Sequence, residues 1–125
     1  MSPEVLKNIL DQNELNDLLE TVLGDLAGVL IEKPGAESNL VQSLNDRWLG
    51  VPRKHIELCA NRAREGNGVG VCAFAVGRER ARVILESTRL GLVNHLVCDH
   101  SLADELVCLI AVSYTHLTLP TILLV

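Results

Sequence analysis

Residues 69–99 read VGVCAFAVGRERARVILESTRLGLVNHLVCD and decide the fold class of this chain. They open with a run of small apolar residues over 69–76, which is typical of a strand buried on both faces. Gly77 predicts a turn, and the apolar spacing over 78–89 predicts a helix. A second apolar run over 92–97 predicts another strand. This order of strand, helix and strand indicates an α/β fold with a partial parallel sheet flanked by helices.

Further elements are predicted on the N-terminal side of this segment. Asp11 with Glu14 three residues later has the form of a capping box that opens a helix. We expect Gly24 to end that helix. Residues 25–31 fit either a strand or a further helical turn, because periodicity alone does not separate the two in so short a run. Residues 52–65 predict a basic helix.

The composition of the whole chain limits its function classes. Of the 125 residues, 48% are hydrophobic and 22% charged, as expected for one globular domain rather than a disordered chain. The formal net charge of −5 argues against nucleic-acid binding through a broad basic face. The four cysteines form no CxxC pair, and no apolar run reaches the roughly 20 residues of a membrane span. We therefore expect a cytoplasmic protein with reduced cysteines and no membrane partner.

Residues 112–125 differ in kind from the rest, because they contain no Asp, Glu, Lys or Arg. The string from Val112 onward resembles one reading frame of a transposase-based sequencing adapter, GTC TCT TAT ACA CAT CTG ACG CTG CCG ACG. We therefore expect 112–125 to be a translated adapter and 1–111 to be the biological sequence. The alternative is a genuine apolar strand at a sheet edge, which Pro120 weakens.

A tight turn at Gly77 is a candidate anion site. Glycine lets the backbone approach a ligand closely, the helix that follows presents unpaired N–H groups, and Arg78 and Arg80 add positive charge. A phosphate or a carboxylate would suit this turn. The alternative is a solvated arginine face that pairs with Glu79 and Glu86 and contributes little.

The glycine-rich segment over 66–70 lies before the same predicted strand. A dinucleotide-binding loop has its glycines after a strand and at the start of a helix, so that its amides face the pyrophosphate. Because these glycines precede the strand, we expect no dinucleotide cofactor.

His95, Cys98, Asp99 and His100 carry side chains that can bind metal ions. On a strand, the odd spacing from His95 to Cys98 places these two on opposite faces, so we expect no metal site. Asp99 and His100 follow the second predicted strand, at the end where open α/β sheets bind ligands. An Asx turn that leads into a helix with Ser101 as its N-cap is the other interpretation.

Three segments carry the motifs of one protein family in the family's order. Residues 24–28 read GDLAG, residues 44–50 read LNDRWLG, and residues 91–99 read GLVNHLVCD. They are similar to a Gly-Asp-hydrophobic-x-Gly segment, a Leu-Asn-Asp-Arg-x-x-Gly segment, and a glycine, hydrophobic residue and Asn followed by a strand and Thr-Asp-Glu. The chain therefore resembles the C-terminal part of SorC/DeoR-type sugar-responsive transcriptional regulators.

The resemblance implies the sugar-binding fold that glucosamine-phosphate deaminases and ribose-phosphate isomerases share. In such regulators a helix-turn-helix domain binds operator DNA, while a phosphorylated sugar or polyol binds at the strand ends and alters oligomerisation. Because no helix-turn-helix pattern precedes Gly24, we expect the DNA-binding domain to be missing from this chain. We expect the intact protein to be a homo-oligomer.

The resemblance also implies effector-binding residues. Asp25 matches a position whose side chain can hydrogen-bond a ligand hydroxyl. Gly77 and Arg80 fall on the family's Gly-Gly-x-x-Lys turn, where Arg80 keeps the positive charge of the lysine and Val76 replaces the first glycine. Asp25, Gly77 and Arg80 are thus the predicted effector site.

We therefore expect an effector-binding module of a transcriptional regulator rather than an enzyme. Its ligand would be a phosphorylated sugar or polyol, and neither a cofactor nor a catalytic residue is expected. The alternative is a fragment of a sugar-phosphate isomerase or deaminase. For that chemistry Asp99 and His100 are the nearby candidates for a general base.

Overall fold

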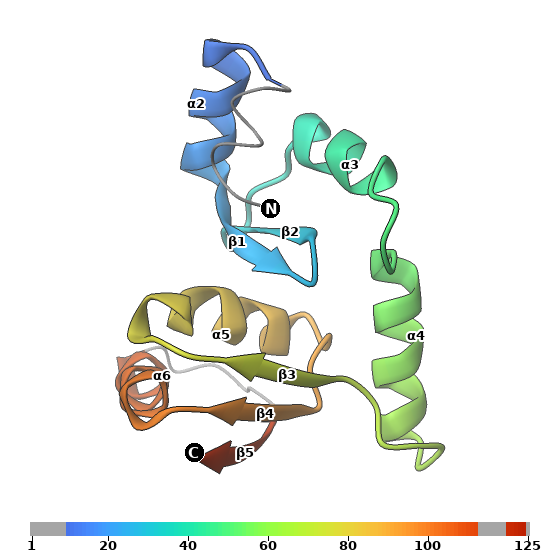
Figure 1. Ribbon diagram of the computed structural model, residues 1–125, viewed down its shortest axis with the longest axis vertical. Helices are drawn as coiled ribbons and strands as arrows, with labels where there is room; N and C mark the ends of the chain where they lie inside the picture. Colours follow the sequence, from blue (N-terminus) through green and yellow to red (C-terminus); the bar gives the residue numbers. More distant parts are fainter. Residues whose placement is uncertain (1–9, 113–119, 125) are drawn as a thin grey trace. The chain divides into compact units, whose positions relative to one another are not determined.

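The computed structural model describes residues 10–112 and 120–124 of the chain (Figure 1). The chain forms two compact units, Met1–Arg53 and Lys54–Val125, and each is described by itself below. The sequence predicts one domain over 1–111 and a tail over 112–125, and that division stays a prediction.

Within its described residues, the first unit combines two helices with a β-hairpin. The two strands pair antiparallel, with Asp25 opposite Leu30 and Leu26 opposite Val29. For residues 25–31 the strand interpretation is therefore confirmed over the paired positions. The elements are α2 (Gln12–Thr21), β1 (Val22–Leu26), β2 (Val29–Glu32) and α3 (Asn39–Asp46).

The capping box at the start of α2 is confirmed. The Asp11 carboxylate accepts a hydrogen bond from the Glu14 amide (2.8 Å), and the Glu14 carboxylate accepts one from the Asp11 amide (3.5 Å). The expectation that Gly24 ends this helix is wrong, because the chain enters β1 already at Val22. Gly24 instead lies opposite Ile31, where pairing with β2 satisfies backbone groups that a helix end would leave open.

One face of α2 and one face of α3 bury the core of the first unit. Leu15 and Leu18 of α2 pack with Leu30 of β2, and Val41 and Leu44 of α3 complete the cluster. Spacings of three residues place each pair on one helix face. Truncating one of these leucines to alanine would cost about 2–5 kcal/mol, as is usual for a buried leucine.

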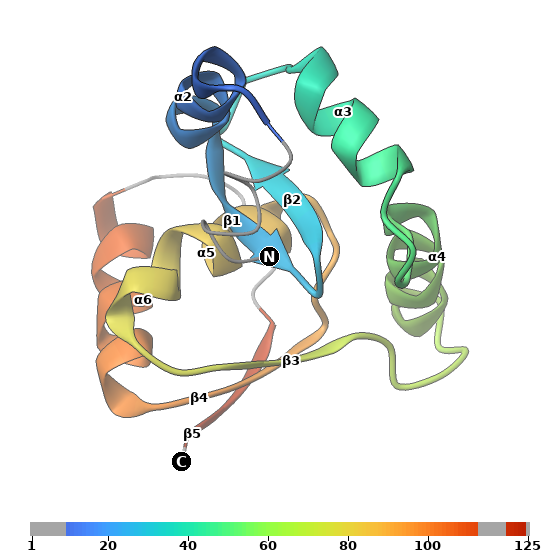
Figure 2. The ribbon, with the colours of Figure 1, turned by 45° about the horizontal axis from the view of Figure 1, so that its top comes forward.

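The second unit is an α/β layer structure with a parallel sheet, as the sequence predicts (Figure 2). Its strands lie in the order β3-β4-β5, and the helices between them make the crossovers. The basic helix predicted over 52–65 is confirmed as α4. The elements are α4 (Arg53–Arg64), β3 (Cys72–Ala75), the 3₁₀ turn η1 (Arg78–Arg80), α5 (Ala81–Arg89), β4 (His95–Cys98), α6 (His100–Val112) and β5 (Thr121–Leu124).

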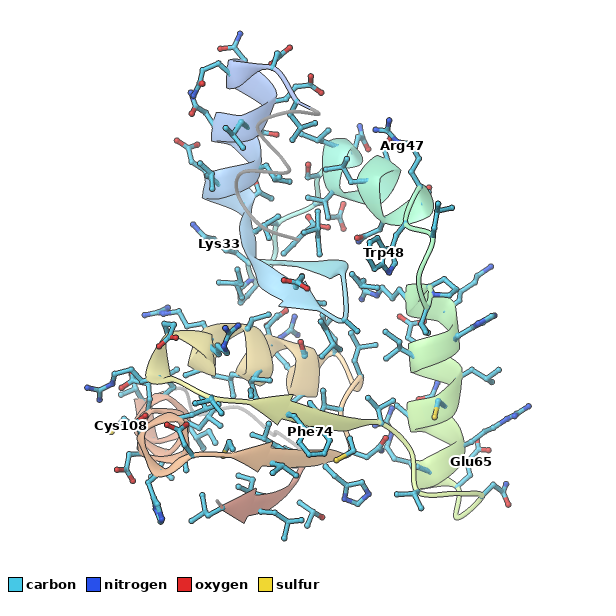
Figure 3. All side chains as sticks on the ribbon, viewed as in Figure 1. Lys33, Arg47, Trp48, Glu65, Phe74 and Cys108 are labelled. Atoms are coloured by element: carbon cyan, nitrogen blue, oxygen red, sulfur yellow. The ribbon has the colours of Figure 1, made fainter. Side chains whose placement is uncertain are left out.

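The strand predicted over 69–76 is not buried on both faces. Along β3 the burial alternates: Ala73 and Ala75 are buried, while Cys72 is exposed and Phe74 is 78% exposed. Right-handed crossovers that advance in one direction across a sheet place both helices on the same side, and α5 and α6 do contact each other. Among the described residues of the second unit, no helix covers the other face of β3, and the ring of Phe74 lies on that face (Figure 3).

Strand β5 lies within the segment predicted to be adapter. It extends the sheet by pairing parallel with β4, from Thr121 opposite His95 to Leu124 opposite Cys98. β5 agrees with the alternative interpretation over Thr121–Leu124 only, and all four of its residues are exposed. That residues 112–125 are encoded by adapter DNA stays a prediction. Residues 113–119 lie outside the described part of the chain.

Within the described residues, no helix has the length and apolar character needed to cross a bilayer.

Candidate functional site

The two turns that follow β3 and β4 meet at the carboxyl end of the parallel sheet. β3 ends at Ala75 and β4 at Cys98, and these two residues are register partners. The Gly77 amide donates a hydrogen bond to Oδ1 of Asp99 (3.1 Å). Sequence reasoning placed both residues at strand ends, but their direct contact was not predicted.

Asp99 is also the N-cap of α6. Its Oδ1 accepts a hydrogen bond from the Leu102 amide (3.3 Å), and its Oδ2 accepts one from the Ser101 hydroxyl (2.7 Å). The predicted cap at Ser101 is therefore wrong by two residues, since α6 begins at His100. The hydroxyl of Ser101 and the amide of Gly77 lower the pKa of Asp99, because these donors favour its charged form.

The backbone at Gly77 has the conformation that the sequence led us to expect at a tight turn. Its φ of 104° lies in the region that favours glycine. A Cβ added there would collide with the carboxylate of Glu79. The chain's own acidic groups, Asp99 and Glu79, therefore lie against the turn where an anion is predicted to bind, and such an anion would have to move Asp99 off the Gly77 amide.

The arginines at this turn have partners within the chain. Nε of Arg80 donates to the carbonyl of Val76 (3.0 Å), and Arg78 forms an exposed ion pair with Glu105 of α6 (3.2 Å). These arginines do not form the ion pairs with Glu79 and Glu86 that the alternative interpretation describes. Glu86 instead pairs with Arg89 on its own helix.

Asp25 lies in the first unit, whereas Gly77 and Arg80 lie in the second. Asp25 is exposed at the end of β1, and its Oδ2 accepts a hydrogen bond from the Gly28 amide (2.9 Å), which closes the hairpin turn. Because the two units are described separately, the combination of Asp25 with Gly77 and Arg80 in one site stays a prediction.

The second family-like segment contacts both β2 and the first family-like segment. Oδ1 of Asn45 accepts from the Leu30 amide (2.8 Å), and Nδ2 of Asn45 donates to the Leu30 carbonyl (3.2 Å). The indole of Trp48 lies so close to Gly28 and Gly50 that a Cβ on either glycine would collide with it. Figure 3 shows Trp48 beside the end of α3. Two glycines and the tryptophan of the family-like segments therefore pack against one another. The spacing of these residues along the sequence could not reveal this contact.

The third family-like segment joins α4 to the sheet. Asn94 accepts from the Val71 amide (2.8 Å) and donates to the carbonyl of Ala60 in α4 (3.3 Å). Arg64 of α4 donates to the carbonyl of Gly91 (2.7 Å). The polar residues of this motif thus fix how β3, β4 and the basic helix lie together.

No family model, curated protein or solved structure matches this chain. The resemblance to sugar-responsive regulators therefore rests on the three sequence segments alone.

His95 and Cys98, the two residues of β4 whose side chains could bind a metal ion, lie on opposite faces of the strand, as the sequence predicts. Leu96 and Cys98 are fully buried on the helix-covered face, and His95 lies half-buried on the opposite one. His95 shares a hydrogen bond with the carbonyl of Val69 (2.9 Å). Burial and the neighbouring Asp99 charge raise the pKa of the Cys98 thiol, which disfavours the thiolate that binds metal. Within residues 10–112 and 120–124 no cluster of three or more His, Cys, Asp or Glu residues is arranged to hold a metal ion.

Proposed function

We propose that this chain is the effector-binding part of a cytoplasmic SorC/DeoR-type transcriptional regulator. Its ligand is a phosphorylated sugar or polyol, which binds at the carboxyl end of the parallel sheet. The observation that carries the proposal is the hydrogen bond between Gly77 and Asp99, because it joins the two strand-end turns at the edge where such sheets bind ligands. Operator binding then requires a helix-turn-helix domain, and the intact regulator assembles as a homo-oligomer.

The contacts at this edge suggest how an effector would act. A phosphate replaces the carboxylates of Asp99 and Glu79 at the Gly77 amide and gains the charge of Arg80 once its guanidinium leaves the Val76 carbonyl. The displaced Asp99 is then able to accept a hydrogen bond from a ligand hydroxyl. Because Asp99 also caps α6, ligand binding would be coupled to the start of that helix.

The bonding of Asp99 favours a binding role over catalysis. A general base works best when its pKa lies near the pH at which it operates. The pKa of Asp99 is lowered instead, because Ser101 and Gly77 donate hydrogen bonds to its carboxylate. These contacts suit a structural link between strand ends better than the proton abstraction that an isomerase or deaminase needs.

The experiment that tests the proposal is a thermal-shift screen of phosphosugars and polyol phosphates on the full chain. A ligand that binds only the folded state raises the unfolding temperature with its concentration. We expect at least one phosphorylated compound to do so, while its unphosphorylated parent does not. Arg80→Ala should abolish the shift, and Arg82→Ala, which replaces an exposed arginine two residues further on, should retain it.

Two results would count against the proposal. One is an unchanged unfolding temperature with every phosphorylated compound. The other is a shift of equal size in wild type and Arg80→Ala. Turnover of any of the compounds by the pure protein would favour the isomerase or deaminase alternative instead.

A further inference from the structure

An open hollow lies beside α4 at the opposite end of β3 from the Gly77 turn. It has a volume of about 290 Å³. One wall is the loop over 67–70, which precedes β3. The other wall consists of four side chains of α4: His55, Leu58, Cys59 and Arg62.

The spacing of these four residues explains why they share one wall. Positions three, four and seven residues apart lie on one face of a helix. A different face of α4 carries Ile56 and Ala60, which are buried. The helix therefore packs against the rest of the unit with its apolar face, and the hollow lies along a different face.

The loop that forms the second wall is held in place without a ligand. The Val71 amide donates to Oδ1 of Asn94 (2.8 Å), and the carbonyl of Val69 shares a hydrogen bond with the His95 ring (2.9 Å). A Cβ on Gly70 would collide with the Asn94 side chain, so the loop approaches the sheet as closely as glycine allows. A wall fixed in this way lowers the entropy cost of binding.

The chemistry of the lining selects the ligand. His55 and Arg62 carry basic groups, and no carboxylate lines the hollow. Apolar surface lies beside them, since Leu58 is 49% and Val69 is 75% exposed. Leu58 stands four residues before Arg62, so an apolar surface and a guanidinium adjoin on one helix face.

We propose that this hollow binds a small organic carboxylate whose body is apolar. The guanidinium of Arg62 takes the carboxylate, for which its fork of donors is suited, and Leu58 and Val69 contact the apolar body. This site is separate from the proposed phosphosugar site, because it lies before β3 rather than after it. It holds whether or not the chain is a sugar-responsive regulator.

The test compares 2-naphthoate with 2-naphthamide by isothermal titration calorimetry on the full chain. The two probes share one apolar body and differ in charge. We expect 2-naphthoate to bind at least about tenfold more tightly, which is the usual weight of a charged hydrogen bond. Arg62→Gln should remove this preference, and the matched control Arg82→Gln should retain it. Leu58→Asn should weaken both probes.

The proposal is overturned if neither probe binds at millimolar concentration, if both bind equally, or if Arg62→Gln leaves the preference intact. Thermal unfolding of each variant shows whether it is folded, and the comparison of the two probes on wild type needs no variant at all. Phosphosugar binding that Arg80→Ala abolishes while 2-naphthoate binding persists would separate this site from the proposed function.

Discussion

The carboxylate of Asp99 holds the backbone amide of Gly77 at 3.1 Å across the ends of two neighbouring parallel strands. The same carboxylate caps α6 through the Leu102 amide. One side chain therefore connects a turn, a strand end and a helix start. This connection is the reason that we propose an effector site at this edge and expect α6 to respond to a ligand there.

Replacing Asp99 with asparagine should make the stability of the chain depend differently on pH. The folded pKa of Asp99 lies below its ordinary value of 3.8, so its charged form stabilises the fold above pH 3.8. That contribution is lost as the pH falls through the folded pKa. We expect wild type to be more stable than Asp99→Asn at neutral pH, and the difference to shrink as the solution is acidified below pH 3.8.

Urea unfolding of both proteins over a pH series measures this difference. Asp104→Asn, which replaces an exposed acidic residue on the same helix, is the control and should cost less stability at neutral pH than Asp99→Asn does. A gap between wild type and Asp99→Asn that stays constant down to strongly acidic pH would contradict the assigned hydrogen bonds.

Gly28→Ala should destabilise the first unit more than Gly35→Ala does. Both glycines have positive φ, 91° and 78°, so alanine at either costs about 1–2 kcal/mol in backbone conformation. Only at Gly28 would the new Cβ also collide with Trp48, whereas nothing lies near Gly35. We expect an additional cost of about 1–3 kcal/mol from overpacking.

The fluorescence of Trp48, the single tryptophan, reports this unfolding directly. Equal free energies of unfolding for Gly28→Ala and Gly35→Ala would mean that the indole does not pack on Gly28 in solution.

Asn45→Ala should lower the free energy of unfolding by about 1–3 kcal/mol. The Asn45 amide satisfies both the N–H and the carbonyl of Leu30, so it stands where a neighbouring strand would pair with β2. Without it, two partly buried backbone groups lose their partners, which carries this penalty. Gln42→Ala, at an exposed position of the same helix, is the matched control in chemical denaturation. A loss of unfolding free energy no larger than that of Gln42→Ala would contradict the two hydrogen bonds between Asn45 and Leu30.

Phe74→Thr should improve solubility while changing the stability of the chain by less than about 0.5 kcal/mol. Its ring is 78% exposed on the open face of the sheet, and exposed substitutions of this kind are close to neutral. Ala73→Thr, the neighbour on the buried face, should be clearly destabilising because the added atoms have no room. Static light scattering and thermal unfolding of the two variants measure both effects. A large loss of stability in Phe74→Thr would show that this face is covered in solution.

Local sequence patterns determined the elements whose hydrogen bonds and apolar spacing lie within a few residues. The capping box of Asp11 and Glu14, the basic helix α4 and the order of strand, helix and strand after Gly68 belong to this group. Each depends on neighbours along the chain, so the sequence carries the information directly. The class of fold follows from the same order, because parallel strands need a crossover between them.

Contacts between distant residues were decided only by the tertiary structure. Nothing in the spacing of Gly77 and Asp99 states that a backbone amide of one turn meets the carboxylate of the next. The exposed face of β3 is a second case: small apolar residues permit burial on both sides, but burial occurs only where another element packs. Residue types set what each side chain can bond, and the path of the chain through space sets which partner it meets.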